Sequence, residues 1–302
     1  MKLRNVVKKC KPLKAAYQGV RQGYYALLTC ISPELNTKAR YRAVFGKKLD
    51  LDAPRTFNEK LLWLKLRRYI SDPLAIQCAD KCRVRDYIEE KGCGDILNDV
   101  IGIYDRAEDI PWDELPDRFV LKWNFGAGMN IVCTDKSALN RDAVIRQMSK
   151  WGRSKYWLAH AEMQYKHAPK KILCEKFLED ATGGGLPDYK VYCFHGKPLA
   201  ILVMHDRGKV LKTEFFDTSW QQLENTDMYL APAHSTQKPA CLDQMLRVSE
   251  RLSEPFPFVR CDYYVVDGKL FFGELTFTPA GGLYTAQTKI NGKEMTEYLN
   301  IP

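Results

Sequence analysis

The chain has 302 residues, 45% of them hydrophobic, and its 46 Lys and Arg against 37 Asp and Glu give a formal net charge of +9. This composition predicts a globular protein with a sizeable core. No apolar run approaches the ~20 residues that cross a bilayer, and residues 1–22 lack the apolar stretch of a secretory signal. Its ten cysteines form no paired zinc knuckles, so we expect reduced thiols in a cytoplasmic protein.

The N-terminal region carries much of the positive charge, because Lys and Arg far outnumber Asp and Glu in the first 50 residues. Apolar spacing predicts a helix over residues 3–30, interrupted at Pro12. Nucleic acid, an anionic membrane surface and an anionic substrate are all partners that fit such charge. A basic helix that faces only solvent fits equally well, so the charge alone leaves these alternatives open.

Two helices are predicted in the next part of the chain. Thr56 and Glu59 form a capping box at the start of TFNEKLLWLKLRRYI, and a second helix begins near Ala79 and ends at Gly92. From Asp95 the pattern becomes short and apolar, as in a strand. Helices mixed with strands predict an α+β protein with several lobes.

The rest of the chain is predicted to be mostly strands. FVLKWNFGAGMNIVC reads as strand, glycine loop and strand, and two further strands join at His195-Gly196. Helices are expected over 137–166 and 239–253. We expect the other strands to cover 171–178 and the two halves of a hairpin turning at Asp267-Gly268.

The last hairpin raises a question about its acidic residues. Glu274 lies on an apolar strand, where an unpaired carboxylate is costly. A two-residue turn would place Glu274 on one face with Cys261, and Asp262 would point away. A three-residue loop with Gly268 as its bulge would make Asp262 and Glu274 diagonal neighbours that could bridge metal ions. Solvated acids, or an ion pair with Arg260, are the alternatives.

Two further features suggest nucleotide chemistry, and each has a plainer explanation. Lys122 precedes a loop of small residues at 126–128, where backbone N–H groups could approach phosphate, although a surface hairpin whose lysine extends its charge to solvent fits as well. The strand end 175–178 could offer its backbone to a purine edge, although a core strand with a charged exit explains it too. Lys190 lies on a strand, where an isolated lysine usually faces solvent.

The order of these elements resembles that of the TupA-like branch of the ATP-grasp superfamily, whose namesake belongs to teichuronopeptide biosynthesis. The stretches that carry the resemblance are RTFNEKLLWLKL, ADKCRVRDYIEE, LPDRFVLKWNFGAGMNIV, DYKVYCFHGKP and VRCDYYVVDGKLFFGELTFTPAGG. The family implies an α+β ATP-grasp fold of three subdomains, with ATP between two α+β lobes, here preceded by an N-terminal helical extension. The expected divisions are the basic extension 1–55, an N-terminal subdomain 56–117, a central lobe 118–178 and a C-terminal lobe 179–302.

The resemblance also implies roles for individual residues. The α- and β-phosphates are assigned to Lys122 with Gly126, Ala127, Gly128 and Met129. Adenine and ribose are assigned to Glu175, Lys176, Phe177 and Leu178, and Lys190 would reach the phosphates from the opposite lobe. Mg²⁺ is assigned to Asp262, Glu274 and Thr276, where Thr276 replaces the usual Asn. Likewise Phe125 stands where this branch usually has His.

The implied chemistry is an ATP-dependent carboxylate–amine ligation through an acyl phosphate. The substrates would be an amino acid and a uronic acid, or similar carboxylate, of a surface polysaccharide. Arg207 and Arg260 are candidates for the transferred phosphoryl charge, or else form ion pairs with Asp206 and Asp262. Asp80, Lys81 and Arg85 are expected to face the acceptor or to lie on a solvated helix.

Two other functions remain open alongside the ligase. A kinase that phosphorylates a sugar or polyol hydroxyl would use the same ATP and Mg²⁺. A catalytically inactive nucleotide-binding or nucleic-acid-binding protein is disfavoured by the intact Lys122, Asp262 and Glu274, and by the lack of aromatic-basic RNA motifs. We expect no nucleic-acid partner. The basic N-terminal helix suggests peripheral contact with the inner membrane face.

Overall fold

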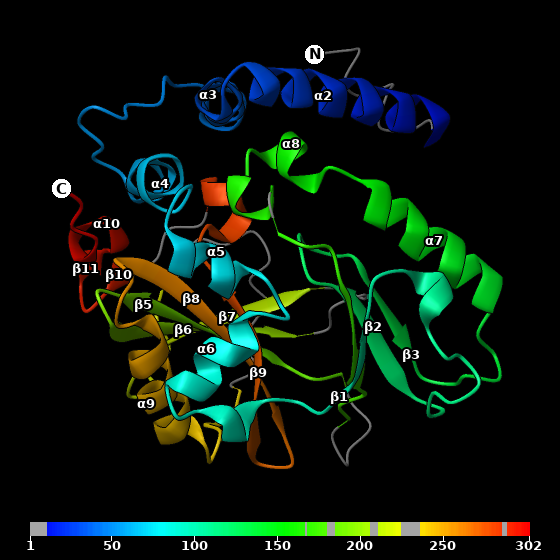
Figure 1. Ribbon diagram of the computed structural model, residues 1–302. Helices are drawn as coiled ribbons and strands as arrows, with labels where there is room; N and C mark the ends of the chain where they lie inside the picture. The colour runs from blue at the N-terminus through cyan, green and yellow to red at the C-terminus, as the bar shows by residue number, and fades with distance from the viewer. Residues whose placement is uncertain (1–10, 167, 180–184, 206–210, 225–235, 286–288) are drawn as a thin grey trace.

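The computed structural model describes residues 11–166, 168–179, 185–205, 211–224, 236–285 and 289–302, although not the side chains of residues 11–16. Within these ranges the chain forms helices and two main antiparallel sheets (Figure 1). The helices are α2 (Lys11–Ile31), α3 (Pro33–Phe45), α4 (Phe57–Trp63), α5 (Pro73–Ala79), α6 (Val84–Glu90), α7 (Arg141–Arg153), α8 (Tyr156–His160), α9 (Leu242–Ser253) and α10 (Met295–Tyr298).

The first sheet has four antiparallel strands in the order β1-β4-β2-β3. Its core packs against α7 through residues that include Val144 and Met148, because these two side chains lie on the buried face of the helix. The predicted helix over 137–166 is broken at Ser154, where α7 ends before the short α8 begins. The strands are β1 (Val100–Tyr104), β4 (Ile172–Lys176), β2 (Phe119–Trp123) and β3 (Asn130–Cys133).

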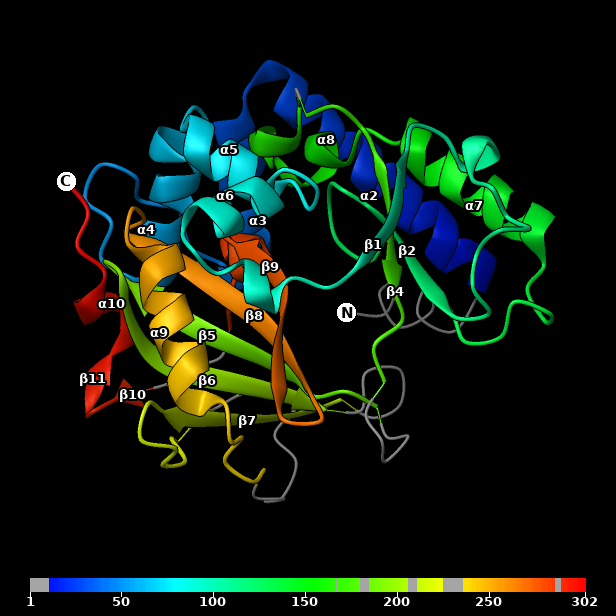
Figure 2. The same cartoon turned by 60° about the horizontal axis from the view of Figure 1, so that its bottom comes forward.

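The second sheet has five antiparallel strands in the order β7-β6-β5-β8-β9, and α9 lies across one of its faces (Figure 2). Every residue of the central β5 is buried, as expected for a strand covered on both sides. The strand β7 was not predicted from the sequence. The strands are β7 (Lys212–Asp217), β6 (Lys197–His205), β5 (Asp188–Phe194), β8 (Phe258–Val266) and β9 (Lys269–Thr276), and β10 (Lys289–Ile290) and β11 (Lys293–Glu294) form a separate pair.

The β8–β9 hairpin differs from both registers expected from the sequence. Its turn has two residues, since Val266 pairs with Lys269, and both Asp267 and Gly268 have positive φ, as in a type I′ turn. Of the two alternatives for the turn, the two-residue turn is therefore confirmed, and the bulge at Gly268 is not formed. A bulge occurs instead at Gly273, because Tyr263 pairs with Phe272 while Asp262 pairs with Glu274. This extra residue returns Asp262 and Glu274 to one face of the sheet.

The N-terminal helices lie against the central part of the chain rather than apart from it. The described part of the helix predicted over 3–30 is α2, from Lys11 to Ile31, and residues 3–10 of that prediction, on which the expected interruption at Pro12 depends, lie outside what the structure describes. Thr29 of α2 donates a hydrogen bond to the backbone oxygen of Leu158 in α8. Arg40 of α3 donates to the backbone oxygen of Ala159. No helix among the described residues is both long and apolar enough to cross a membrane.

The region after α3 holds one confirmed and one revised prediction. The capping box of Thr56 and Glu59 is present at the start of α4. The helix expected from Ala79 to Gly92 is instead two elements, because α5 ends at Ala79 and α6 begins only at Val84. Asp80 lies between them, and its carboxylate accepts hydrogen bonds from the backbone of Cys82 and Arg83.

Candidate nucleotide and metal site

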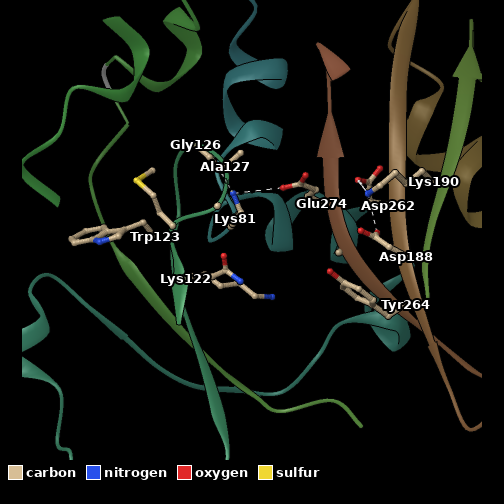
Figure 3. Close-up of a pocket in the computed structure, with 14 residues that line it drawn as sticks. Lys81, Lys122, Trp123, Gly126, Ala127, Asp188, Lys190, Asp262, Tyr264 and Glu274 are labelled. Atoms are coloured by element: carbon tan, nitrogen blue, oxygen red, sulfur yellow. Dashed lines mark hydrogen bonds and ion pairs between the residues drawn. The ribbon is translucent and has the colours of Figure 1, made fainter. Parts of the chain in front are cut away.

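A cavity of about 360 Å³ lies between the glycine loop of the four-stranded sheet and strands β5, β8 and β9 of the five-stranded sheet (Figure 3). Its volume is in the usual range for small-molecule sites. Eight of the predicted site residues line it: Lys122, Gly126, Ala127, Gly128, Met129, Lys190, Asp262 and Glu274. The other lining residues are Lys81, Trp123, Asn130, Asp188, Tyr264 and Gly273.

Asp262 and Glu274 lie directly opposite each other on neighbouring strands, and both line the cavity. A side chain at the intervening Gly273 would be crowded, because a Cβ there would lie 3.0 Å from the backbone oxygen of Asp262. Thr276 donates a hydrogen bond to Glu274 Oε1 at 3.3 Å and accepts one from Arg260 at 3.2 Å. The bulge, rather than the turn, therefore brings the predicted metal ligands together.

Asp262 belongs to a buried cluster of two acids and two bases. Lys190 Nζ lies 2.6 Å from Asp262 Oδ2 and 2.9 Å from Asp188 Oδ1, and Arg260 donates two hydrogen bonds of 2.7 Å to the Asp262 carboxylate. Because all four side chains are largely buried, the balance of charge limits the cost of removing them from water. Lys190 therefore does not face solvent as an isolated strand lysine usually does.

Two groups of this cluster, Asp262 and Arg260, have shifted pKa values. Burial alone would raise the pKa of Asp262, but Arg260 and Lys190 outweigh burial and hold that pKa below its usual value. Burial would lower the pKa of Arg260, and the neighbouring Asp262 instead raises it. Asp262 is consequently a carboxylate anion at neutral pH, which is the state needed to bind a cation.

The glycine loop faces these carboxylates from across the cavity. Gly126 and Gly128 have φ values of +70° and +72°, a conformation that side chains disfavour. A Cβ on Gly126 would also lie 2.6 Å from Met129 Cε and 2.8 Å from the Tyr156 ring, whereas Gly128 has open space. The loop can thus present its backbone closely to a ligand.

Buried Asn124 fixes the start of this loop. Its amide nitrogen donates to Asp80 Oδ2 at 2.7 Å and to the backbone oxygen of Pro169 at 2.8 Å, and its side-chain oxygen accepts from the backbone of Lys171 at 2.9 Å. Burial raises the pKa of Asp80, while the hydrogen bonds from Cys82, Arg83 and Asn124 oppose the shift. Asp80 is therefore occupied in holding the loop rather than facing an acceptor.

Two lysines reach the cavity from the loop side. Lys81 Nζ donates to the backbone oxygen of Gly126 at 2.9 Å and lies 3.7 Å from Glu274 Oε2 (Figure 3). Lys122 Nζ lies 2.5 Å from Glu175 Oε2. Arg85 also contacts Glu175, at 3.6 Å, so it lies behind Lys122 rather than in the cavity lining.

The segment predicted to hold adenine lies outside this lining. Lys176 makes backbone contacts with Asp99 and with the side chain of Asn98. The Phe177 ring lies 4.4 Å from the guanidinium of Arg118, and both line a separate hollow. The roles of Glu175, Lys176, Phe177 and Leu178 stay predictions. Arg207 lies outside the described residues.

Several cavity residues were not recognised from the sequence as nucleotide-site candidates. Asp188 had a usable signal, since alternation places it on one face with Lys190. Lys81 was expected at the acceptor or on a solvated helix face, because nothing in its local pattern links it to the distant Gly126 or Glu274. Tyr264 also had a usable signal, since alternation along the strand places it on one face with Asp262.

The donor set suits Mg²⁺ when phosphate oxygens complete it. Asp262 and Glu274 supply carboxylate oxygens and Thr276 a hydroxyl, which are the hard donors that Mg²⁺ prefers. Among the described residues, no group of three or more His, Cys, Asp or Glu side chains is placed to hold a metal.

Comparison with known proteins gives a family match over most of the chain. Residues 59–299 match the family described as TupA-like ATPgrasp. A search of curated proteins finds no match.

Among solved structures, D-alanine–D-alanine ligase from Bacillus anthracis complexed with ATP is 17% identical, with 67% of this chain and 54% of that chain covered and a TM-score of 0.40. L-amino acid ligase from Bacillus licheniformis is 15% identical, with 80% of this chain and 53% of that chain covered and a TM-score of 0.44. N5-carboxyaminoimidazole ribonucleotide synthetase from Thermus thermophilus is 13% identical, with 68% of this chain and 46% of that chain covered and a TM-score of 0.41. The chain spans about half the length of these structures.

Proposed function

Since the chain belongs to the TupA-like ATP-grasp family, we propose that it is an ATP-dependent carboxylate–amine ligase that forms an amide through an acyl phosphate. One observation carries the proposal most directly. Asp262 and Glu274 lie opposite each other at one wall of a cavity whose other wall is the glycine loop with Lys81 and Lys122. Such an arrangement of cations, backbone N–H groups and metal-binding acids suits a polyphosphate with Mg²⁺.

In this proposal each wall binds a different part of the nucleotide. Lys122 and the backbone of 126–129 hold the α- and β-phosphates, with Lys81 beside them. Lys190 contacts the phosphates from the five-stranded sheet. The segment 175–178 holds adenine and ribose, because it forms the end of β4, the strand that pairs with the Lys122 strand, and the two residues after it.

Asp262, Glu274 and Thr276 would hold Mg²⁺, which neutralises charge on the transferred phosphoryl group. Arg260 donates to Asp262 and Thr276 and so positions both. It also places a cation close to the site of transfer. We assign the same duty, binding phosphoryl charge, to Arg207.

The reaction proceeds in two steps. A carboxylate oxygen of the first substrate attacks the γ-phosphorus of ATP, so that the terminal bridging P–O bond breaks and ADP leaves. The amine of the second substrate then attacks the acyl carbon. The amide bond forms, phosphate leaves, and the amine loses a proton. The protein contributes position and charge rather than a nucleophile.

The proposed carboxylate substrate is a uronic acid or similar group of a surface polysaccharide, and the amine is that of an amino acid. The supporting facts are the family match and the basic character of the chain, which suits an anionic acceptor. We place the protein in the cytoplasm, with peripheral contact at the inner membrane face.

Product analysis tests the proposal. The protein is incubated with ATP, Mg²⁺, a uronic acid glycan and a pool of amino acids. Free phosphate released together with an amide-linked glycan is the expected result. A stable phosphorylated glycan with no amide would replace the ligase by a kinase. ATP hydrolysis independent of both substrates would also contradict the ligase.

A further inference from the structure

Helix α2 exposes a continuous apolar stripe along its outer face. Its residues are between 52% and 75% exposed, which is unusual for large apolar side chains gathered on one helix. Their spacing of three and four residues places them on one face over about 21 Å of helix. The stripe consists of Tyr17, Val20, Tyr24, Leu27 and Ile31.

This stripe is not the face by which α2 packs on the protein. The packing face carries the buried Tyr25 and Thr29, and Thr29 donates to Leu158 of α8. Asn36 of α3 donates to the backbone oxygen of Tyr25 at 2.8 Å, so it holds α3 to the same packing face of α2. In Figure 1, α2 lies at the edge of the molecule with α8 on its inner side.

The positive charge near the stripe limits the kinds of partner that can cover it. The first 33 residues contain seven Lys and Arg and no Asp or Glu, and within α2 these are Lys11, Lys14 and Arg21. A second copy of the helix packed in parallel would bring like charges together, and an antiparallel copy would leave the basic residues without an acidic partner, since α2 contains no Asp or Glu. An anionic lipid surface instead attracts the basic residues and takes up the apolar ones, and tyrosine favours that interface.

We propose that α2 lies in the plane of an anionic membrane surface and inserts Tyr17, Val20, Tyr24, Leu27 and Ile31 at the boundary between headgroups and acyl chains. This inference deepens the proposed location and does not depend on the ligase chemistry. It also gives the site a constant position relative to the membrane, because α2 is held to α8 on the chain that follows the glycine loop.

The test measures binding to vesicles without nucleotide or substrate, so its outcome is separate from that of the ligase assay. The full chain is sedimented with phosphatidylcholine vesicles, or with vesicles that also contain about 30 mol% phosphatidylglycerol. We expect binding to the anionic vesicles, weakened when NaCl is raised from about 0.1 M to about 0.5 M. Absence of binding, or equal binding to both vesicles, would overturn the proposal.

Variants separate the contribution of the apolar stripe to vesicle binding from that of the positive charge. Val20→Ser with Leu27→Ser should weaken anionic-vesicle binding at least about tenfold. Arg21→Glu should weaken it as well, because it reverses one charge. The matched control is Gln18→Ser with Gln22→Ser, which changes two exposed residues of α2 outside the stripe and should bind as the wild type does.

The oligomeric state shows whether a second copy of the chain, rather than a membrane, covers the stripe. If light scattering shows a dimer that Val20→Ser with Leu27→Ser dissociates, the stripe covers a second copy, and the membrane proposal fails. Because the substituted side chains are exposed, thermal unfolding of the variant should match that of the wild type. ATP turnover with a water-soluble acceptor should also be unchanged.

Discussion

Lys81 Nζ lies 3.7 Å from Glu274 Oε2 and donates a hydrogen bond to the backbone oxygen of Gly126, so one lysine spans the cavity from the glycine loop to the acidic strand. It follows Asp80, whose carboxylate is bound to Asn124 at the start of the same loop. The region between α5 and α6 therefore sets the spacing between the two walls of the site.

Replacing Lys81 with Met should weaken ATP binding. The substitution removes a cation near the proposed phosphates, and charged hydrogen bonds of this kind contribute enough to raise the KM for ATP roughly tenfold or more. Steady-state kinetics measure the change. Lys81→Arg should recover part of the loss, and Lys91→Met, at a surface ion pair with Glu254, should have no effect. A Lys81→Met enzyme with unchanged KM and kcat would exclude a role in binding.

Replacing Glu274 with Gln should abolish ATP turnover without unfolding the protein. The amide keeps the size of the side chain but loses the anionic oxygen proposed for Mg²⁺, and we expect a fall of at least ~100-fold in kcat. Glu274 is 39% exposed, so its neutral form leaves no deeply buried group unpaired. Circular dichroism and ATP turnover are measured together, with Glu294→Gln as the exposed control. Substantial residual activity would remove Glu274 from the metal site.

Two glycines of one loop offer a matched comparison. Gly126→Ala and Gly128→Ala both force alanine to a positive φ, but only the Cβ at position 126 meets Met129 and Tyr156. We expect Gly128→Ala to lower the free energy of unfolding by about 1 kcal/mol, and Gly126→Ala by about 2–4 kcal/mol. Urea unfolding measures both. Equal effects would mean that the crowding at Gly126 is relieved at no cost.

Replacing Asp262 with Asn should destabilise the fold as well as the site. It leaves Arg260 and Lys190 without their shared anion in a buried cluster, a change that costs about 3–5 kcal/mol. Urea unfolding at neutral pH measures it. Asp113→Asn is the control, because Asp113 is almost fully exposed. A loss as small as that of the control would show that the cluster reorganises around the amide.

The depressed pKa of Asp262 predicts that the stability of the protein depends on pH. Because its folded pKa is depressed, Asp262 stabilises the folded state at pH values above its ordinary unfolded pKa of about 4. That contribution is lost as the pH falls from there through the folded pKa. Unfolding free energies between neutral pH and about pH 3 should fall less steeply in Asp262→Asn than in the wild type. Identical slopes would contradict the depressed pKa.

Elements that depend only on neighbouring residues could be predicted from the sequence. The capping box at Thr56 and Glu59, the glycine loop after Lys122 and the turn at Asp267-Gly268 are all present, because caps and turns require particular residues at fixed short spacings. The order of the motifs also indicated the family that the comparison found.

Tertiary structure alone decided how these elements meet. The bulge at Gly273 restores Asp262 to the face of Glu274; a glycine within a strand is compatible with a bulge, but only the pairing of the two strands decides that one forms and which residues it brings opposite each other. Lys81 and Asn124 join the site through partners distant in the sequence. Likewise, sequence predicts that α2 is a helix, but only its packing on α8 shows which apolar residues are left exposed. Burial and charge pairing arise between segments, so they become visible only when the segments are placed together.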